Sequence, residues 1–253
     1  MTVHDLDGFF RSLLDIDGFS ATDRSLNGLQ VGNNGEPVQK IAFAVDACLE
    51  SFKKAADAGA GLIFVHHGLF WGYPLQVTGR HRSRLQFLLD NNIALYAAHL
   101  PLDQHPSLGN NAALADMLNL TDREPFGNHH GRAIGCWGKL SPEMSVDEAA
   151  RRIRYLDRPV AGIFPFGVPL NKTCAVISGG APELAYEAIE RKIDLYVTGE
   201  SSHTIYHHIL EGKLNVVAGG HYNTEVWGLR RIMEQCAFKL SLAVEFIDVP
   251  TGL

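Results

Sequence analysis

The sequence predicts an α/β protein built from two related α/β lobes with mostly parallel sheets. Short apolar, β-branched runs alternate with segments of helical period, and the same order of runs returns in the second half of the chain. Strands that alternate with helices form parallel sheets that helices cover. The 253 residues suffice for one large domain or two small ones.

The first lobe is expected to cover residues 1–120. Thr2 and Asp5 have the pattern of a helix N-cap, and residues 27–32, Asn-Gly-Leu-Gln-Val-Gly, predict a turn that leads into extended chain. Strands and helices then alternate. The predicted strands are 40–45, 62–65 and 93–98, and the predicted helices are 49–58, a segment around 85–89, and 112–118.

Residues 121–171 form a β-α-β segment that either links the lobes or extends their sheets. Its strands are predicted at 132–140 and 160–164, and Ser145 with Glu148 predicts a capping box. The second lobe, residues 172–253, repeats the alternation and ends with a long helix after Thr224. Its predicted strands are 173–177, 195–198 and 214–218.

The two lobes can be aligned, which gives the hypothesis of an internal duplication. Lys40 heads the first strand of one lobe as Lys172 heads that of the other. After the third strand of each lobe stands a His followed four residues later by a carboxylate, first His99 and Asp103, then His221 and Glu225. A metal site shared about a pseudo-twofold axis would need this arrangement.

Composition restricts the location and the binding partners. No apolar run is long enough to span a bilayer, so no membrane protein is expected. The N-terminus lacks a basic stretch followed by an apolar core, which predicts a cytoplasmic protein. Four scattered cysteines without a CxxC pair indicate core residues in a reducing compartment: Cys48, Cys136, Cys174 and Cys236.

A net charge of −6 does not support general nucleic-acid binding. Two basic patches remain, which are solvated helix faces or contact surfaces for a nucleic acid or another partner. They comprise Arg80, His81, Arg82 and Arg84, and Arg151, Arg152 and Arg154.

Candidate metal ligands follow the strands. His66 and His67 come directly after an apolar strand, at the carboxyl edge where α/β proteins build their sites. Alone, such a pair is more often two half-buried histidines bonded to carbonyls. Asp103, which follows the next strand, shifts the interpretation towards metal because it stands too far before Gly109 to cap the next helix. His99 is expected as a proton carrier or as a packing residue.

The third group of candidates lies in the second lobe. His221 is expected just before a helix capped by Asn223 or Thr224, with Glu225 in its first turn. Glu225 either bridges two cations with its two oxygens or only complements the helix dipole. Glu200 and His203 follow the strand that corresponds to the His66–His67 strand, so they are expected to contact substrate.

Three imidazoles and two carboxylates suit Zn, Mn, Fe or Co and suit Ca poorly. Two cations roughly 3.5 to 4 Å apart would lower the pKa of a shared water and stabilise the attacking and leaving oxygens. The predicted cofactors are therefore two divalent metal ions per chain, held by His66, His67, Asp103, His221 and Glu225, and hydrolysis is the favoured reaction.

Five motifs follow one another along the chain: Asn27–Gly32, His66-His67-Gly68, His99-x-x-x-Asp103, Thr198-Gly199-Glu200 and Gly220-His221-Tyr222-x-Thr224-Glu225. Together they resemble the Nif-three-like dinuclear metal-binding family, whose members are often named GTP cyclohydrolase 1 type 2 homologues. The resemblance implies the same five ligands, two α/β lobes with the metal site in the cleft between them, and a ring-like homohexamer. The short middle segment resembles the form without an inserted domain.

Two functions follow as hypotheses. The first is a metal-dependent hydrolase of a nucleotide-like or other phosphate-bearing small molecule, in which His99 and Glu225 act catalytically. The alternative is a metal-stabilised hexameric scaffold or regulatory adaptor that binds a protein or nucleic acid. The sequence has no GxxxxGK[ST] phosphate loop that would support a triphosphate pocket.

Overall fold

The computed structural model describes all 253 residues and confirms the predicted fold class, since it has two sheets in which most strands point the same way. The chain divides into two compact units. The first contains residues 1–102 and 229–249, and the second contains residues 103–228 and 250–253. The sequence placed boundaries at 120 and 171 instead. The C-terminal part of the last helix and the final strand belong to the first unit, an assignment that local sequence patterns do not encode.

The first unit has a five-stranded sheet in the order β1-β4-β3-β2-β11, in which only β1 is antiparallel to its neighbour. The strands are β1 (Gly28–Val31), β2 (Lys40–Asp46), β3 (Leu62–His67), β4 (Ala94–Ala97) and β11 (Ala243–Phe246). The helices are α1 (Val3–Leu14), η1 (Ile16–Phe19), α2 (Leu49–Asp57) and α3 (Gly79–Asp90).

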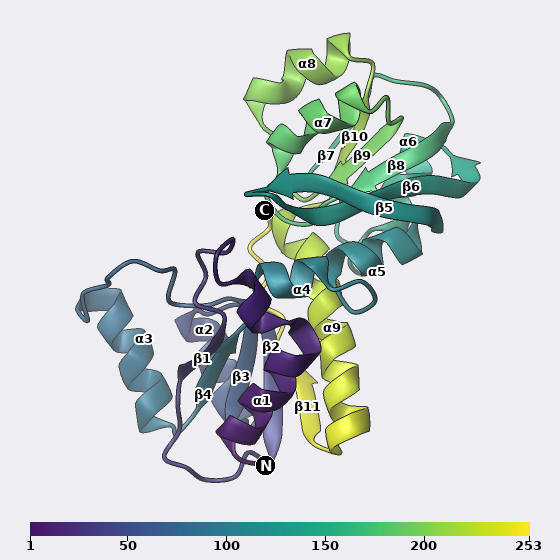
Figure 1. Ribbon diagram of the computed structural model, residues 1–253. Helices are drawn as coiled ribbons and strands as arrows, with labels where there is room; N and C mark the ends of the chain where they lie inside the picture. The colour runs from purple at the N-terminus through teal and green to yellow at the C-terminus, as the bar shows by residue number, and fades with distance from the viewer. The chain divides into compact units, whose positions relative to one another are not determined.

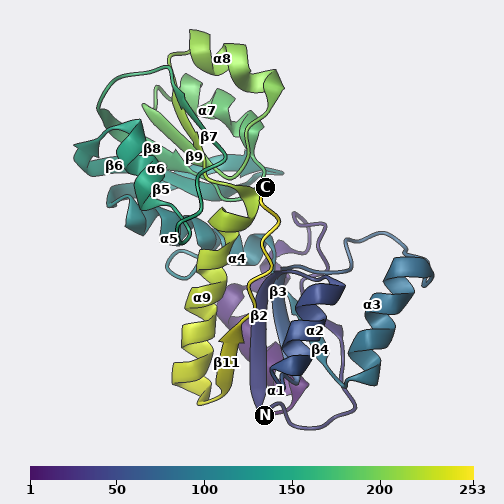
Figure 2. The same ribbon diagram turned by 180° about the vertical axis from the view of Figure 1, so that it is seen from behind.

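Helices cover both faces of this sheet, with α1 on one face and α2 and α3 on the other (Figure 1 and Figure 2). The central strands are therefore buried on both faces, which is why they read as continuous apolar runs. Stacked, tilted and edge-on rings of Phe10, Phe43, Phe64 and Tyr96 fill the space under α1, with centroids 4.8 to 5.5 Å apart in the contacting pairs.

The second unit has a six-stranded sheet in the order β5-β6-β8-β9-β10-β7. The strands are β5 (Leu120–His129), β6 (Arg132–Met144), β7 (Gly162–Pro165), β8 (Asn171–Val176), β9 (Leu195–Thr198) and β10 (Asn215–Ala218). The helices are α5 (Asn110–Met117), α6 (Val146–Arg152), η2 (Pro182–Leu184), α7 (Ala185–Glu190), η3 (His203–Ile205) and α8 (Tyr206–Glu211). Two helices contain residues of both units, α4 (Leu100–Gln104) and α9 (His221–Leu240).

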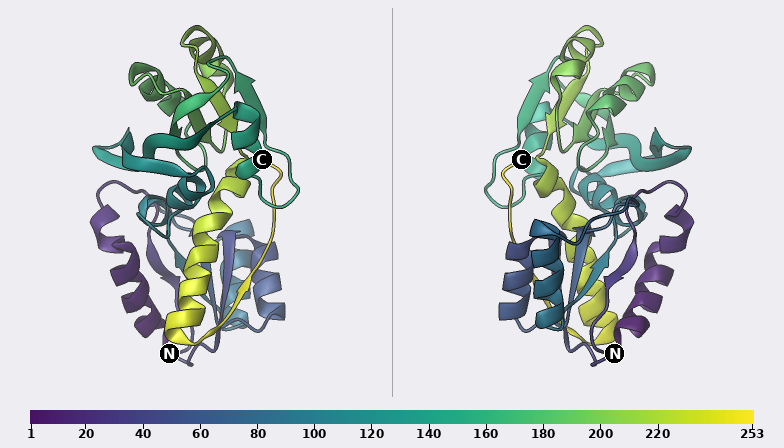
Figure 3. Two further views of the ribbon diagram at one scale, coloured as in Figure 1. Left: turned by 90° about the vertical axis from the view of Figure 1, so that its right-hand side faces the viewer. Right: turned by 90° about the vertical axis from the view of Figure 1, so that its left-hand side faces the viewer.

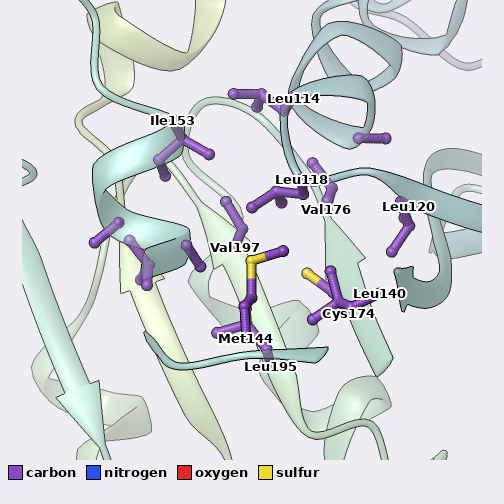
Figure 4. Packing of buried hydrophobic residues seen from close by; sticks show 14 of the residues in the cluster. Leu114, Leu118, Leu120, Leu140, Met144, Ile153, Cys174, Val176, Leu195 and Val197 are labelled. Carbon is purple, nitrogen blue, oxygen red and sulfur yellow. The ribbon is translucent and has the colours of Figure 1, made fainter. Parts of the chain in front are cut away.

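The segment 121–171 extends this second sheet, because it supplies most of β5 and all of β6 and β7. Helices α5 and α6 pack on one face of the sheet around a core that includes Leu114, Leu118, Ile153, Val176 and Val197 (Figure 4). Helices α7 and α8 lie on the other face (Figure 3).

The two sheets share a topological element. In each, three parallel strands stand in chain order, β2-β3-β4 in the first unit and β8-β9-β10 in the second. In each, an antiparallel strand that precedes the three in the sequence pairs with the third of them, β1 with β4 and β7 with β10. This correspondence supports the hypothesis of an internal duplication. None of the helices has the length and apolar character needed to cross a bilayer.

Candidate metal-binding clusters

The structure brings three imidazoles of the first unit together. Strand β3 continues through His67, yet the rings of His66 and His67 lie only 4.6 Å apart between centroids. His99, which follows β4, places its ring 5.0 Å from that of His66 and 5.7 Å from that of His67. One ligand atom of each of the three residues lies within 4.8 Å of the others. This distance allows three donors to converge on a cation.

Each of these imidazoles is oriented through its Nδ1 atom by an oxygen. The distance is 3.0 Å from His66 to the carbonyl of Ala98 and 2.9 Å from His67 to Asp46 Oδ1. His99 Nδ1 lies 3.0 Å from Asp23 Oδ1. An acceptor at Nδ1 favours the tautomer with its proton there, so Nε2 carries the lone pair. This is the usual arrangement of a metal-binding histidine and its supporting residue.

The two supporting carboxylates were missed in the sequence. Asp46 is the last residue of β2 and lies one position beyond the predicted strand. Its place at the carboxyl edge of a parallel sheet could have identified it as a candidate site residue. Asp23 lies in a loop and is separated from His99 by 76 residues, so no local pattern reveals it. Burial would raise the pKa of Asp23, but the hydrogen bond and charge of His99 outweigh it and lower the pKa to about 2.

In the second unit, Asp103 lies in the short helix α4 and its side chain is buried. Its Oδ1 accepts hydrogen bonds from Asn110 Nδ2 and Ser178 Oγ, each at 2.9 Å. The N-cap position of the following helix, α5, is occupied by Gly109. This agrees with the expectation that Asp103 lies too far before the helix to cap it. Two donors on one oxygen fix the orientation of the carboxylate.

His221 and Glu225 lie one helical turn apart in α9. The helix begins at His221 and not after Thr224, because Gly220 turns the chain with φ +97° and Thr224 Oγ1 bonds back to the carbonyls of Gly220 and His221. His221 Nε2 lies 3.2 Å from Glu225 Oε1. A ligand atom of Glu225 also lies within 4.8 Å of one of Asp103. The second unit thus groups two carboxylates and an imidazole.

Glu200 supports His221 from the other side of the ring, where its Oε1 lies 2.5 Å from Nδ1. Burial would lower the pKa of His221, but the hydrogen bond and charge of Glu225, followed by those of Glu200, raise it to about 9. The sequence predicted Glu200 as a substrate contact, whereas its observed contact is with His221. His203 lies in η3 with its side chain exposed, and no hydrogen bond or ion pair joins it to these residues.

Gly179 makes room for Glu225. It has φ +66°, a conformation that favours glycine, and a Cβ atom there would overlap Glu225 Oε1. Gly199 approaches the same turn so closely that its Cβ would lie 2.5 Å from the carbonyl oxygen of Gly179. The turns after β8 and β9 therefore have the shape that the Glu225 carboxylate requires.

The donors of both clusters fit a divalent transition metal. The first cluster offers the Nε2 atoms of three imidazoles, each oriented by an oxygen at its Nδ1 atom. The second cluster offers two carboxylates and one imidazole. Imidazole and carboxylate donors suit Zn, Mn, Fe or Co, while Ca prefers six to eight oxygens. Fold and donors together define a class, an α/β protein with candidate metal-ligand clusters at the carboxyl ends of its strands.

The chain belongs to the DUF34/NIF3 family (NGG1p interacting factor 3), whose sequence model matches residues 1–251. This confirms the family identified from the five motifs. A relative from Treponema pallidum, named GTP cyclohydrolase 1 type 2 homolog, is 40% identical over all of both chains.

Solved structures agree with this assignment. A crystal structure of a protein from Thermus thermophilus has a TM-score of 0.91 at 35% identity and covers 100% of each chain. Reduced HcgD from Methanocaldococcus jannaschii has a TM-score of 0.85 at 29% identity and covers 98% of each chain.

Proposed function

We propose that this protein is a hydrolase that depends on two divalent metal ions and acts on a nucleotide-like, phosphate-bearing small molecule. The proposed ligands are His66, His67, Asp103, His221 and Glu225. One observation carries the proposal: every histidine of the first cluster has its Nδ1 atom on an oxygen acceptor, which leaves Nε2 as the donor atom. Histidines that only pack in a core have no need of a common tautomer.

The residues have separate tasks in this proposal. Glu225, with two oxygens on one buried carboxylate, would contribute to holding both ions, and Asp103 would hold its carboxylate in a fixed orientation because Asn110 and Ser178 donate to it. When bound, a pair of divalent ions supplies Lewis acidity, which lowers the pKa of water and offsets negative charge on the substrate. His99 accepts a proton during hydrolysis, and Asp23 stabilises the resulting imidazolium.

The names of the relatives provide the first substrate to test. Opening a purine ring needs an activated water, so GTP is chemically compatible with the proposed ions. The absence of a GxxxxGK[ST] loop means that any phosphate contacts must come from other residues.

We also infer a cytoplasmic homohexamer. The four cysteines are free thiols, and burial raises the pKa of Cys174 and Cys236, which keeps them unreactive in a reducing compartment. The assembly rests on the family resemblance, and mass photometry of the purified protein measures it directly.

The decisive experiment is metal content per chain on protein purified without chelator, combined with a turnover screen. GTP, other nucleotides and phosphoesters are tested with Mn, Zn, Fe and Co. The wild type should hold close to two metals, and His67→Ala and Asp103→Ala should lose at least one together with turnover. His4→Ala, an exposed histidine of the first unit, is the matched control and should keep both.

The outcomes separate the two functions. Glu225→Gln should abolish turnover while the assembly persists. Two metals without turnover on any substrate would favour the metal-stabilised scaffold instead, and no metal in any preparation would refute both.

A further inference from the structure

A pocket in the first unit opens beside the histidine cluster and is not used by the proposed metal ligands. It has a volume of about 630 Å³. Pockets of roughly 300 to 1,000 Å³ accept small organic ligands. Its lining combines aromatic, apolar and basic side chains, chiefly Trp71, Tyr73, Leu75, Arg80, His81 and Arg84.

The basic wall of the pocket has no carboxylate to neutralise it. Arg80 and Arg84 lie on α3, whose only acidic residue is Asp90 at its far end, and neither arginine forms an ion pair. Arg80 lies in the first turn of α3, where the helix dipole stabilises acidic side chains and destabilises basic ones. The dipole therefore does not explain why an arginine stands there. A charged wall of this kind suits an anion, and a guanidinium matches phosphate with two parallel hydrogen bonds.

His81 adds an imidazole ring to the lining of the pocket. Its Nε2 atom is buried and has no hydrogen-bond acceptor or donor in the structure, while its ring packs edge-on against Phe70 at 5.4 Å. Because Nε2 has almost no accessible surface, a ligand in the pocket would meet the ring of His81 and not this nitrogen.

The aromatic wall is held in place from the histidine side. The indole N–H of Trp71 donates to the Gly68 carbonyl at 3.0 Å, and its ring lies 5.0 Å from His99 and 6.1 Å from His67. Gln30 anchors the start of the same loop, because its Oε1 accepts from the backbone N–H of Leu69 at 2.8 Å. The pocket and the histidine cluster therefore share one fixed side chain.

The outer part of this wall consists of exposed side chains with large apolar surfaces. Tyr73 is 58% exposed and Leu75 is 36% exposed, within one loop at the carboxyl end of a parallel strand. Exposed aromatic side chains near such an edge offer a face on which a flat ring can stack.

We propose that this pocket binds a nucleotide, with its phosphates on Arg80 and Arg84 and its base against Tyr73. The proposal rests on the proposed function and gives its substrate a binding site, because it places a nucleotide next to the Trp71 that contacts His67 and His99. The basic patch of α3 is then a small-molecule site and not a solvated face or a contact surface for a macromolecule.

The test measures GTP binding by calorimetry on the full chain after chelator treatment, so that neither metals nor turnover are needed. The double variant Arg80→Gln/Arg84→Gln should weaken GTP at least tenfold. Arg82→Gln is the matched control, since Arg82 has the same charge on the same helix but does not line the pocket, and it should change affinity less than twofold. Tyr73→Ala should weaken GTP but leave inorganic triphosphate unchanged.

Several results would overturn the proposal: no GTP binding at millimolar concentration, equal losses in the double variant and in Arg82→Gln, or binding of single-stranded RNA without binding of mononucleotides. Failure here is distinguishable from failure of the hydrolase. GTP binding that requires the two arginines, without turnover under any metal, supports the pocket and rejects the hydrolase. Metal-dependent turnover with an unchanged KM in the double variant rejects the pocket and supports the hydrolase.

Discussion

In the first unit the candidate ligands are imidazoles fixed by hydrogen-bond acceptors, whereas in the second unit the carboxylate of Asp103 is fixed by hydrogen-bond donors. The histidines sit at strand ends, where neighbouring strands bring them together, while the second unit uses the first turn of α9 and a glycine turn. The first arrangement fixes the tautomer of each imidazole, and the second fixes the orientation of a carboxylate. The two clusters should therefore fail in different ways when they are perturbed.

The largest effect is expected from Gly179→Ala in the second unit. The added Cβ would overlap Glu225 Oε1, and φ +66° is strained for alanine, so we expect a stability loss of about 1–2 kcal/mol and loss of at least one metal per chain. Metal analysis and urea unfolding measure both. Gly8→Ala in α1 is the control, because nothing lies within 4 Å of its Cβ position. It should raise stability by roughly 0.5–1 kcal/mol with full metal content, and equal metal content in both variants would refute the role of the glycine turn.

The next effect concerns the residues that orient the imidazoles. Asp46→Asn offers an amide N–H to His67 Nδ1 and so favours the tautomer with its proton on Nε2, which should weaken metal binding about 10- to 100-fold. Glu200→Gln should cost less, because the side chain of Glu200 is 47% exposed against 34% for Asp46, so solvent weakens its contact with His221 more. Competition with a chelator measures the affinities, and the exposed Glu50→Gln should change nothing. A larger loss for Glu200→Gln than for Asp46→Asn would reverse the comparison.

The positions predicted best from the sequence are those of the candidate ligands that follow a strongly apolar strand. His66 and His67 interrupt a run that is buried on both faces, so their place at a sheet edge was readable from the chain. Asp23 was not readable, because its relation to His99 spans 76 residues and depends on tertiary structure. The start of α9 was misplaced, since Thr224 looks like a cap but is an internal residue that bonds back to Gly220.

The two edge strands of the first sheet were missed for a similar reason. Strands β1 and β11 have four residues each, and the burial of β11 alternates between exposed and half-buried residues. Such short runs carry too little pattern to be distinguished from a loop.

A third prediction concerns pH in metal-free protein. The pKa of His221 is about 9 in the folded state against 6.5 ordinarily, so its protonated form stabilises the fold fully below about pH 6.5, and this contribution is lost as the pH rises through 9. We expect a loss on the order of 1–2 kcal/mol between pH 6.5 and 9.5. Urea unfolding across this range measures it, and His221→Asn should lack this part of the slope. Stability that is flat or rises with pH in the wild type would contradict the charged His221–Glu225 pair.

The smallest effect is expected at Lys40 and Lys172, which occupy aligned positions in the two units. Comparing them tests whether aligned positions contribute equally to stability. Lys40 is mostly buried along its side chain, and its Nζ donates to the Ala58 carbonyl at 2.9 Å and pairs with Glu245 at 2.5 Å. Lys172 is 72% exposed and its Nζ lies 3.8 Å from Glu143. Lys40→Met should therefore cost about 1 kcal/mol, and Lys172→Met should stay within roughly 0.5 kcal/mol of the wild type. Equal losses of unfolding free energy would mean that the two aligned lysines contribute equally to stability. The expected inequality means that the two units share a topology but differ in the contacts made at aligned positions.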